Sequence, residues 1–341
     1  MNDQQGSTRA PTAGVRLLHE QEVRDLISRE DAFEAVRDAF ARMGRGETTV
    51  PPVMIIYVPE SEGEVHVKAA HLHHAEHYAV KFASIFERNP ARGLAAVSGV
   101  ILVFSAATGF LSGMLLDNGF LTDLRTGAAG ALAADLLAKR EIAQVAIIGA
   151  GIQGRFQLEA LLGVRRPIGV RICDMDRQAA ETYALEMAQK TGLPVTVAPG
   201  VREAVDGADI IVSTTPAQKP YLMADWVSPG AHITAMGSDN PMKNELEPAL
   251  LRRADKLVVD SVDMCALNGE LHHALAQGLL TRDGVFAELG EIAAGLKQGR
   301  TTDDEITVAD LTGLGIQDTA VANHVMRQAA AQEVGRSLES L

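Results

Sequence analysis

The segment Val145-Ala146-Ile147-Ile148-Gly149-Ala150-Gly151-Ile152-Gln153-Gly154 decides the fold that we expect for this chain of 341 residues. Four apolar residues, typical of a short buried strand, run directly into a Gly-x-Gly-x-x-Gly turn, and a helical stretch, 151–162, follows. The first glycine of such a turn permits a tight bend, the second lets the backbone approach a pyrophosphate, and the third lets the helix pack closely on the strand. The segment therefore predicts a Rossmann-type dinucleotide site, with cofactor contacts at Gly149, Gly151, Ile152, Gln153 and Gly154.

The acidic residue that such a site uses to bind the adenosine ribose is expected at Asp174. It lies 20 residues after Gly154, at the end of the next predicted strand, 169–174. A carboxylate in this place accepts hydrogen bonds from the ribose hydroxyls and repels a 2′-phosphate, which favours NAD over NADP as the cofactor. Asp176 is the competing candidate, and its alternative role is the N-cap of the following helix. Arg177 weakens the preference for NAD, because a nearby arginine can accommodate a 2′-phosphate.

Strands and helices alternate from Thr122 to about residue 311, which predicts an α/β fold with a Rossmann-type doubly wound sheet. Thr214 and Thr215 end one of these strands, 210–214, where ligands bind in such sheets. They are candidates for cofactor binding, and capping of backbone groups is an equally good role for both. The other expected elements are helices at 122–139 and 177–190 and strands at 145–149, 195–198, 232–236 and 256–259.

The first part of the chain has a different pattern and predicts a second, α+β domain with an antiparallel sheet. An amphipathic helix is expected at 31–43, and turn residues separate five successive runs of strand-forming residues. These runs are 53–58, 65–71, 78–86, 97–104 and 110–117. A last helix, about 316–336, is expected to return to this domain. The predicted organisation is a disordered tail at 1–14, a substrate-binding and dimerisation domain at 15–122 plus 312–341, and an NAD-binding domain at 123–311.

Composition argues against several other classes of protein. The net charge of −13 opposes binding to nucleic acid or anionic lipid, and 4% aromatic residues leave few platforms for stacking bases. Two distant cysteines make neither a disulfide framework nor a zinc motif, which together with the absence of a signal-peptide pattern favours a cytoplasmic protein. The uncharged stretch 93–116 is long enough to span a membrane, but its glycines predict a buried hairpin instead.

Four segments resemble the ornithine cyclodeaminase/mu-crystallin family. They are the glycine turn itself, Tyr78-Ala79-Val80-Lys81-Phe82, Leu121-Thr122-Asp123-Leu124-Arg125-Thr126-Gly127-Ala128-Ala129 and Ala235-Met236-Gly237-Ser238-Asp239. The resemblance extends from about residue 15 to the end of the chain. It implies a homodimer formed through the sheet of the first domain, a small amino or imino acid as substrate in a cleft between the domains, and hydride transfer at the carbon of a C–N bond. The scaffold alone does not fix the reaction.

The resemblance also assigns three residues to catalysis. Arg125 matches the family's arginine for the substrate carboxylate, which a planar guanidinium holds in two places; an ion pair between helices is its alternative role. Lys81 matches the catalytic-site lysine, which binds carboxylate or donates a proton; a solvated strand lysine is the alternative. Asp239 matches the catalytic aspartate, which exchanges a proton with the substrate nitrogen; an Asx turn is the alternative. Thr126, beside Arg125, is expected to contact the cofactor.

The chain departs from the family pattern at two predicted substrate contacts. Many members carry an arginine shortly after the first Pro-Pro, where this chain has Val53 and Met54. Where members often have a threonine on the substrate face, Ala96 stands here, and Ser98 is its expected substitute. We expect Met54, Ser98 and His71 around the substrate, and these departures put ornithine as substrate in doubt.

Three functions therefore stay open from the sequence. The first is an NAD-dependent oxidoreductase for the C–N bond of an amino or imino acid, such as a ketimine reductase or an amino-acid dehydrogenase. The second is a cyclodeaminase that reduces and reoxidises NAD within one cycle, and the third is a nucleotide-binding protein without catalysis, of the mu-crystallin type. A run of histidines, 66–77, contains no cysteine or carboxylate set typical of a metal site, so no metal is expected.

Overall fold

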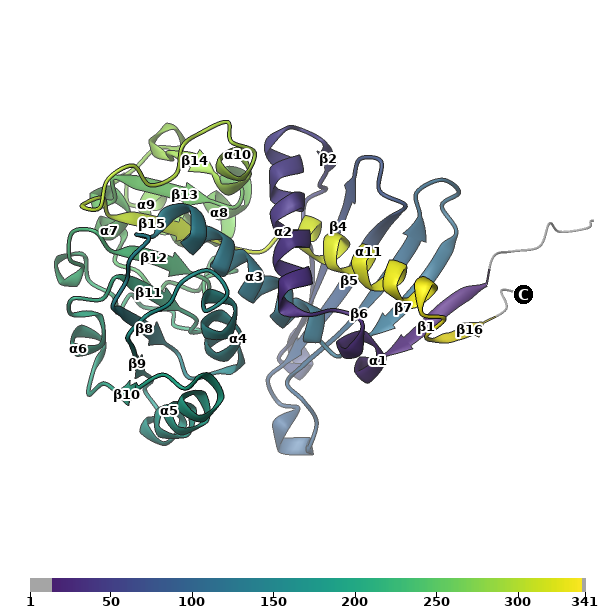
Figure 1. Cartoon of the computed structure of the whole chain (residues 1–341), viewed down its shortest axis with the longest axis horizontal. Helices are drawn as coiled ribbons and strands as arrows, with labels where there is room; N and C mark the ends of the chain where they lie inside the picture. Colours follow the sequence, from purple (N-terminus) through teal and green to yellow (C-terminus); the bar gives the residue numbers. More distant parts are fainter. Residues whose placement is uncertain (1–13, 339–341) are drawn as a thin grey trace, which may run out of the picture.

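The computed structural model describes residues 14–338, which form two lobes with one large sheet each (Figure 1). Apart from Gly14, the predicted tail at 1–14 lies outside the described residues. The α/β fold, with one Rossmann-type sheet and one mainly antiparallel sheet, is confirmed. Within residues 14–338, no helix combines the length and the apolar character needed to cross a bilayer.

The later lobe holds a parallel sheet in the strand order β10-β9-β8-β11-β12-β15-β13-β14. The chain proceeds outward from β8 to β10 and then returns to the other side of β8 with β11, so the strand order reverses between β8 and β11. Ligands of doubly wound sheets bind at the carboxyl ends of the two strands that flank such a reversal. The strands are β8 (Gln144–Ile148), β9 (Gly169–Cys173), β10 (Val195–Val197), β11 (Ile210–Ser213), β12 (His232–Ala235), β13 (Lys256–Val259), β14 (Ala287–Glu288) and β15 (Thr307–Asp310).

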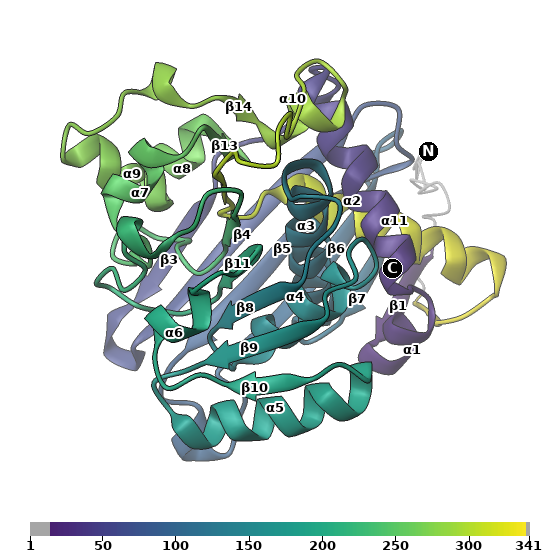
Figure 2. The same cartoon turned by 60° about the vertical axis from the view of Figure 1, so that its left-hand side comes forward.

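Helices connect these strands and cover both faces of the sheet (Figure 2). In α5 the N-cap residue Asp176 accepts hydrogen bonds from the backbone of Gln178 and Ala179, and Gly192 ends the helix in the left-handed conformation. The helices of this lobe are α4 (Ile152–Leu161), α5 (Arg177–Thr191), α6 (Val201–Val205), α7 (Pro248–Arg253), α8 (Val262–Asn268), α9 (Glu270–Ala276) and α10 (Leu289–Ala293).

The earlier lobe is a mainly antiparallel sheet in the order β16-β1-β7-β6-β5-β4-β2, with β3 also paired to β4. Helices α2 and α11 lie across one face of it (Figure 1). That face contributes Leu72, Ile101 and Leu115 to a core shared with Phe40 and Val325 of the two helices. The elements are β1 (Val15–His19), α1 (Glu20–Asp25), α2 (Arg29–Gly44), β2 (Thr48–Thr49), β3 (Met54–Val58), β4 (Gly63–Leu72), β5 (His77–Phe86), β6 (Val97–Ser105), β7 (Leu111–Leu116), α11 (Gly315–Ala331) and β16 (Arg336–Leu338).

The end of the chain corrects one sequence expectation. The last helix ends at Ala331 and does not continue to Arg336. Glu333 and Gly335 adopt positive φ angles of 57° and 93°, which turn the chain back. Residues 336–338 then pair antiparallel with β1 and form an edge strand, β16, and the sequence pattern indicated neither of these two strands. Short edge strands carry too few residues for a period of two to be visible.

Two segments connect the lobes, and both are buried. The first is α3 (Phe120–Leu137), which follows β7 and packs against α4, and the second is 311–314, which joins β15 to α11. A Cβ atom on Gly127 would lie 2.8 Å from the carbonyl oxygen of Phe156, so α4 approaches α3 this closely only because a glycine stands there. Residues of α3 and of 311–314 are therefore held at the boundary between the two sheets.

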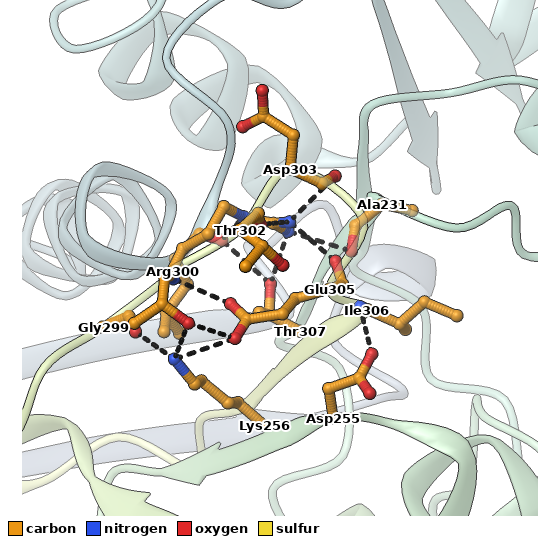
Figure 3. Close-up of polar contacts among 12 residues, drawn as sticks. Ala231, Asp255, Lys256, Gly299, Arg300, Thr302, Asp303, Glu305, Ile306 and Thr307 are labelled. Atoms are coloured by element: carbon orange, nitrogen blue, oxygen red, sulfur yellow. Dashed lines mark hydrogen bonds and ion pairs between the residues drawn. The ribbon is translucent and has the colours of Figure 1, made fainter.

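A polar network fastens the loop before β15 at the amino ends of the parallel strands (Figure 3). The guanidinium of Arg300 donates to the backbone oxygens of Leu137, Ala231 and Glu305 at 2.6 to 3.3 Å. Beside it, Lys256 forms an ion pair of 3.1 Å with Glu305. Burial raises the pKa of Glu305, but hydrogen bonds from Thr301 and Lys256 outweigh that effect and lower the pKa to about 2.

Replacing Arg300 by alanine is expected to destabilise the fold without affecting ligand binding. The change leaves several backbone oxygens without their donor, so the free energy of unfolding should fall by about 2–4 kcal/mol. Denaturant unfolding measures the loss, and alanine in place of the exposed Arg166 is the matched control, expected within about 0.5 kcal/mol of the native protein. A loss for Arg300→Ala no larger than the control's would show that the network does not stabilise the loop.

Candidate active site

A cavity of about 690 Å³ opens at the carboxyl ends of β8, β9 and β11. Its lining includes five of the residues predicted for the cofactor. These are Gly149, Gly151, Asp174, Thr214 and Thr215. The cavity lies beside the point where the strand order reverses, as expected for a dinucleotide in a doubly wound sheet.

The three glycines of the turn differ in whether, and why, the folded chain requires a residue without a Cβ atom. Gly149 has φ of 108°, and a Cβ atom on it would lie 2.7 Å from the Thr214 hydroxyl oxygen. A Cβ atom on Gly154 would collide with the carbonyl oxygen of Gly149, so the third glycine brings α4 close to β8. A Cβ atom on Gly151 meets nothing within 4 Å. The folded chain itself therefore does not require the second glycine, which fits a backbone kept bare for a pyrophosphate.

Asp174 lies at the glycine turn, and its neighbours Asp176 and Arg177 are engaged by other groups. Its carboxylate accepts hydrogen bonds from the backbone nitrogens of Ala150 at 2.7 Å and Asp176 at 2.8 Å. Asp176 takes its alternative role as the N-cap of α5. Arg177 forms an exposed ion pair of 2.8 Å with Glu181. Asp174 is thus the carboxylate that lines the cavity, and Arg177 is paired with Glu181.

The other predicted cofactor residues surround the turn without all lining the cavity. Thr214 donates from its hydroxyl to the carbonyl oxygens of residues 148 and 149, which is its capping role. Gln153 donates to Asp123 at 2.6 Å. Ile152 is exposed on the first turn of α4, and Thr126 is buried against that helix. Thr215 hydrogen-bonds the carboxylate of Glu245, which also accepts from Tyr221 at 2.6 Å.

Lys81 and Arg125 meet at a carboxylate that the sequence analysis missed. Asp318 of α11 lies 2.9 Å from the Lys81 ammonium and 3.2 Å from Nε of Arg125, and all three side chains are buried. Arg125 also donates to Gln317 at 2.5 Å. Arg125 therefore also forms the ion pair between helices that was its alternative role, with Asp318 of α11 as its partner. Asp318 follows the segment 311–314, so the contact exists only where both connections between the lobes come together.

Burial and positive neighbours change the acidity of this cluster. Burial, followed by the charges of Arg125 and Lys68, lowers the pKa of Lys81 to about 7, although Asp318 acts in the opposite direction. Burial raises the pKa of Asp318, but Lys81 and Arg125 outweigh it and keep the pKa below the ordinary value. The cluster is thus a cationic site with one fixed counter-charge, which suits an anionic ligand.

Binding of a carboxylate to this cluster is expected to weaken as pH rises through 7. Lys81 has a lowered pKa of about 7, so its ammonium form predominates below that pH and is lost above it. The Kd of an unreactive carboxylate should rise by up to about tenfold per pH unit above pH 7, measured by calorimetry. In Asp318→Asn the loss should begin at lower pH, because the anion that raises the pKa of Lys81 is gone. A Kd that stays constant from about pH 6 to 9 would contradict this assignment.

A second lysine, Lys68, lies directly opposite Lys81 in the β4–β5 pairing and was also missed. It is buried, and its ammonium donates to the carbonyl oxygens of Thr312 at 3.3 Å and Gly313 at 2.8 Å. Gly313 has φ of 81°, and a Cβ atom on it would lie 2.6 Å from Nη1 of Arg125. The available signal was the alternation of polar residues at 64, 66 and 68 in β4, which sets Lys68 on one face with His66.

Asp239 follows β12 and forms an ion pair of 2.6 Å with Lys243. Partial burial raises its pKa, but Lys243, Lys68 and His66 outweigh that effect and keep the pKa below the ordinary value. The carboxylate is therefore ionised at neutral pH, at the carboxyl end of the parallel sheet, and lies near the β4 residues Lys68 and His66. The Asx turn, which was the alternative role of Asp239, is made instead by the next residue, Asn240, which accepts from the backbone nitrogens of Met242 and Lys243.

The structure corrects the positions of Met54, Ser98 and His71. Paired residues of antiparallel strands share a face, and successive residues alternate between faces. Met54 is paired with Val67 and Ser98 with Ser84, which places both on the face opposite Lys68 and Lys81. His71 lies three residues after Lys68 in β4 and therefore shares that opposite face. The register of the hairpin, which the sequence did not reveal, turns these side chains away from the cationic cluster of Lys68, Lys81 and Arg125.

Among the described residues no group of three potential metal ligands is found.

Comparisons with known proteins agree with this geometry. The ornithine cyclodeaminase/mu-crystallin family model matches residues 15–333. Similar proteins include an iminosuccinate reductase of Paracoccus denitrificans, 34% identical over 95% of this chain and 99% of that one. Two solved structures have TM-scores of 0.90. One is an archaeal alanine dehydrogenase dimer with bound NAD, 36% identical over 96% of this chain and all of that one. The other is the Thermococcus litoralis Δ1-pyrroline-2-carboxylate reductase with NADH and L-proline, 32% identical over 95% of this chain and all of that one.

Proposed function

Because the chain belongs to the ornithine cyclodeaminase/mu-crystallin family, we propose that it is an NAD-dependent oxidoreductase acting on the C–N bond of an amino or imino acid. The observation that carries this proposal is the buried contact of Lys81 and Arg125 with Asp318, at the boundary between the lobes. A cationic pair with one shared counter-charge fits an α-carboxylate. NAD(H), when bound in the cavity at the glycine turn, supplies or accepts the hydride.

Arg125 and Lys81 bind and orient the substrate carboxylate. The contacts of Arg125 with Asp318 and Gln317 use Nε and Nη1. Nη2 has no hydrogen-bond partner among residues 14–338 and is therefore available to a ligand. Asp318 positions both cations before the substrate arrives, which reduces the cost of ordering two long side chains. A carboxylate held at two points fixes the direction in which the Cα–H bond points.

Asp239 handles the proton at the substrate nitrogen. In the oxidative direction its carboxylate accepts a proton from the amine, and in the reductive direction the acid form protonates the imine nitrogen. Lys243 holds this carboxylate in place at 2.6 Å. Thr122, which accepts a hydrogen bond from Lys81 at 3.1 Å, fixes the lysine on the other side.

The test is turnover with a panel of 2-oxo acids, each with ammonia or an amine, followed through the absorbance of NADH. We expect oxidation of NADH with at least one imino acid, and a loss of activity in Asp239→Asn with unchanged affinity for NADH. Release of ammonia from ornithine without net change in NADH would identify a cyclodeaminase instead. Tight NADH binding without any turnover, unaffected by Asp239→Asn, would identify a binding protein.

We further propose that the protein is cytoplasmic. We also propose that it forms a homodimer through the face of the antiparallel sheet that α2 and α11 leave uncovered. Apart from Ser84, Ser98 and His71 many side chains there are apolar, and Met54 and Ile56 are 53% and 46% exposed. The archaeal alanine dehydrogenase is a dimer.

Replacing Phe82, on the same face, by aspartate is expected to convert a dimer into a monomer. A charge in an apolar interface loses its solvation without gaining a partner. Sedimentation measures the mass, and Glu60→Gln, at an exposed turn residue, is the control. A mutant that remains dimeric would show that this face is not the interface.

A further inference from the structure

Three buried cations lie together at the boundary between the lobes, and only one carboxylate contacts them among the described residues. Lys68, Lys81 and Arg125 are all buried, and Asp318 is the carboxylate in direct contact with this group. Asp239 lies nearby, but its charge is already paired with Lys243 at 2.6 Å. One α-carboxylate bound by Arg125 and Lys81 therefore leaves Lys68 without a carboxylate in direct contact.

Lys68 is the cation that the family assignments do not explain. Like charges directly opposite each other in a sheet are destabilising, and Lys68 lies directly opposite Lys81. The hydrogen-bond acceptors of Lys68 are two carbonyl oxygens, those of Thr312 and Gly313, which lower the cost of desolvation. The carboxylates of Asp318, Asp239 and Asp260 act on Lys68 without contacting it, and burial outweighs them and keeps its pKa below the ordinary value. An ammonium has three donors, so one remains for a ligand.

An unpartnered donor lies in the same cluster. The side-chain nitrogen Nε2 of Gln317 is buried and has no hydrogen-bond partner among residues 14–338. Its own oxygen accepts from Arg125, so the amide is fixed with its donor end free. A free donor on Lys68 and another on Gln317 suit an additional acceptor group of a ligand.

Most of the charged side chains that line a cavity at the start of β4 have the opposite charge. This cavity of about 600 Å³ is lined by Glu62, Glu64 and Glu87 from the antiparallel sheet and by Asn240 and Lys243 from the other lobe. Glu64 lies on the same strand face as Lys68, four residues away, which is about 13 Å along a strand. A second anionic group on a long side chain would reach these carboxylates and be repelled, whereas a short one stays near Lys68.

From this arrangement we infer that the substrate is a short dicarboxylic amino or imino acid, whose second carboxylate is bound by Lys68. The inference rests on the proposed function and specifies its substrate class. Arg125 and Lys81 hold the α-carboxylate, which every amino or imino acid has. Lys68, with the free donor of Gln317, holds the second carboxylate, which distinguishes dicarboxylic from monocarboxylic substrates. Lys68 is thus a specificity-determining residue.

Two matched ligand pairs test the inference. Succinate and butyrate have the same number of carbons and differ in one carboxylate, and their Kd values are measured by calorimetry on the protein saturated with NADH. L-Aspartate and L-2-aminobutyrate form the same comparison for kcat/KM with NAD⁺. We expect the dicarboxylate to be preferred at least about 30-fold in both pairs, a factor typical of one charge-assisted contact.

Variants at Lys68 connect this preference to the residue. Lys68→Met should reduce both ratios to about threefold or less and leave butyrate binding within about threefold of the native protein, whereas Lys68→Arg should retain the preference. Lys219→Met, which removes an exposed lysine, controls for the change in net charge. If Lys68→Met weakened both members of each pair equally, or if the native protein preferred butyrate, the inference would be overturned.

The outcomes also separate this inference from the proposed function. Turnover of monocarboxylic substrates alone would sustain the proposed function and remove the dicarboxylate assignment. Lys68-dependent binding of succinate without turnover of any amino or imino acid would sustain the second anion site and remove the proposed function.

Discussion

Replacing Arg125 by methionine is expected to lower kcat/KM at least a thousandfold for every substrate that the protein accepts. The guanidinium is buried and is held by Asp318 at 3.2 Å and Gln317 at 2.5 Å, so its free donors are fixed before a ligand arrives. Loss of two charge-assisted hydrogen bonds and of the orientation that they impose corresponds to about 4 kcal/mol in the transition state. Steady-state kinetics in both directions measure the effect.

The control for this prediction separates catalysis from folding. Arg125→Met alone leaves Asp318 with only Lys81 as its partner, and a buried carboxylate that loses a partner is destabilising. The double variant Arg125→Met/Asp318→Asn removes the unpaired charge and should recover part of the stability but none of the activity. The affinity for NADH should remain within about threefold in both variants. A loss of less than about tenfold in kcat/KM for Arg125→Met would show that another residue holds the shared carboxylate.

Valine in place of Gly151 is expected to weaken NADH binding at least about 100-fold while the protein without ligand keeps its Tm. A Cβ atom on Gly151 meets nothing within 4 Å, and the residue has φ of −75° and ψ of −169°, an extended conformation that valine adopts readily. The new side chain would occupy the space through which the pyrophosphate approaches the backbone. Calorimetry with NADH and thermal unfolding without it measure the two effects.

Gly154→Val provides the contrasting variant. Its Cβ atom would collide with the carbonyl oxygen of Gly149, so it should lower the Tm as well as NADH binding. If Gly151→Val bound NADH as the native protein does, the cavity at the glycine turn would not be the cofactor site, and the proposed function would lose its basis.

The sequence by itself determined the Rossmann sheet and the place of its ligand. Apolar strands entering glycine turns are local features, and the positive φ of Gly149 and the contact of Gly154 with Gly149 both arise within the turn, so the pattern carries them. The motif segments also identified Lys81, Arg125 and Asp239, because the resemblance depends on short contiguous stretches.

The tertiary structure alone decided which side chains lie together in the cationic cluster. The register of β4 against β5 sets Lys68 opposite Lys81 and turns Met54, Ser98 and His71 to the other face. In a strand the side chains alternate, so a shift of one residue in register exchanges the two faces, and hydrophobicity does not fix the register when both faces are largely apolar. Asp318 reaches Arg125, 193 residues earlier in the chain, because α11 returns to the first sheet. A contact across that separation depends on the packing of whole elements, which no local pattern encodes.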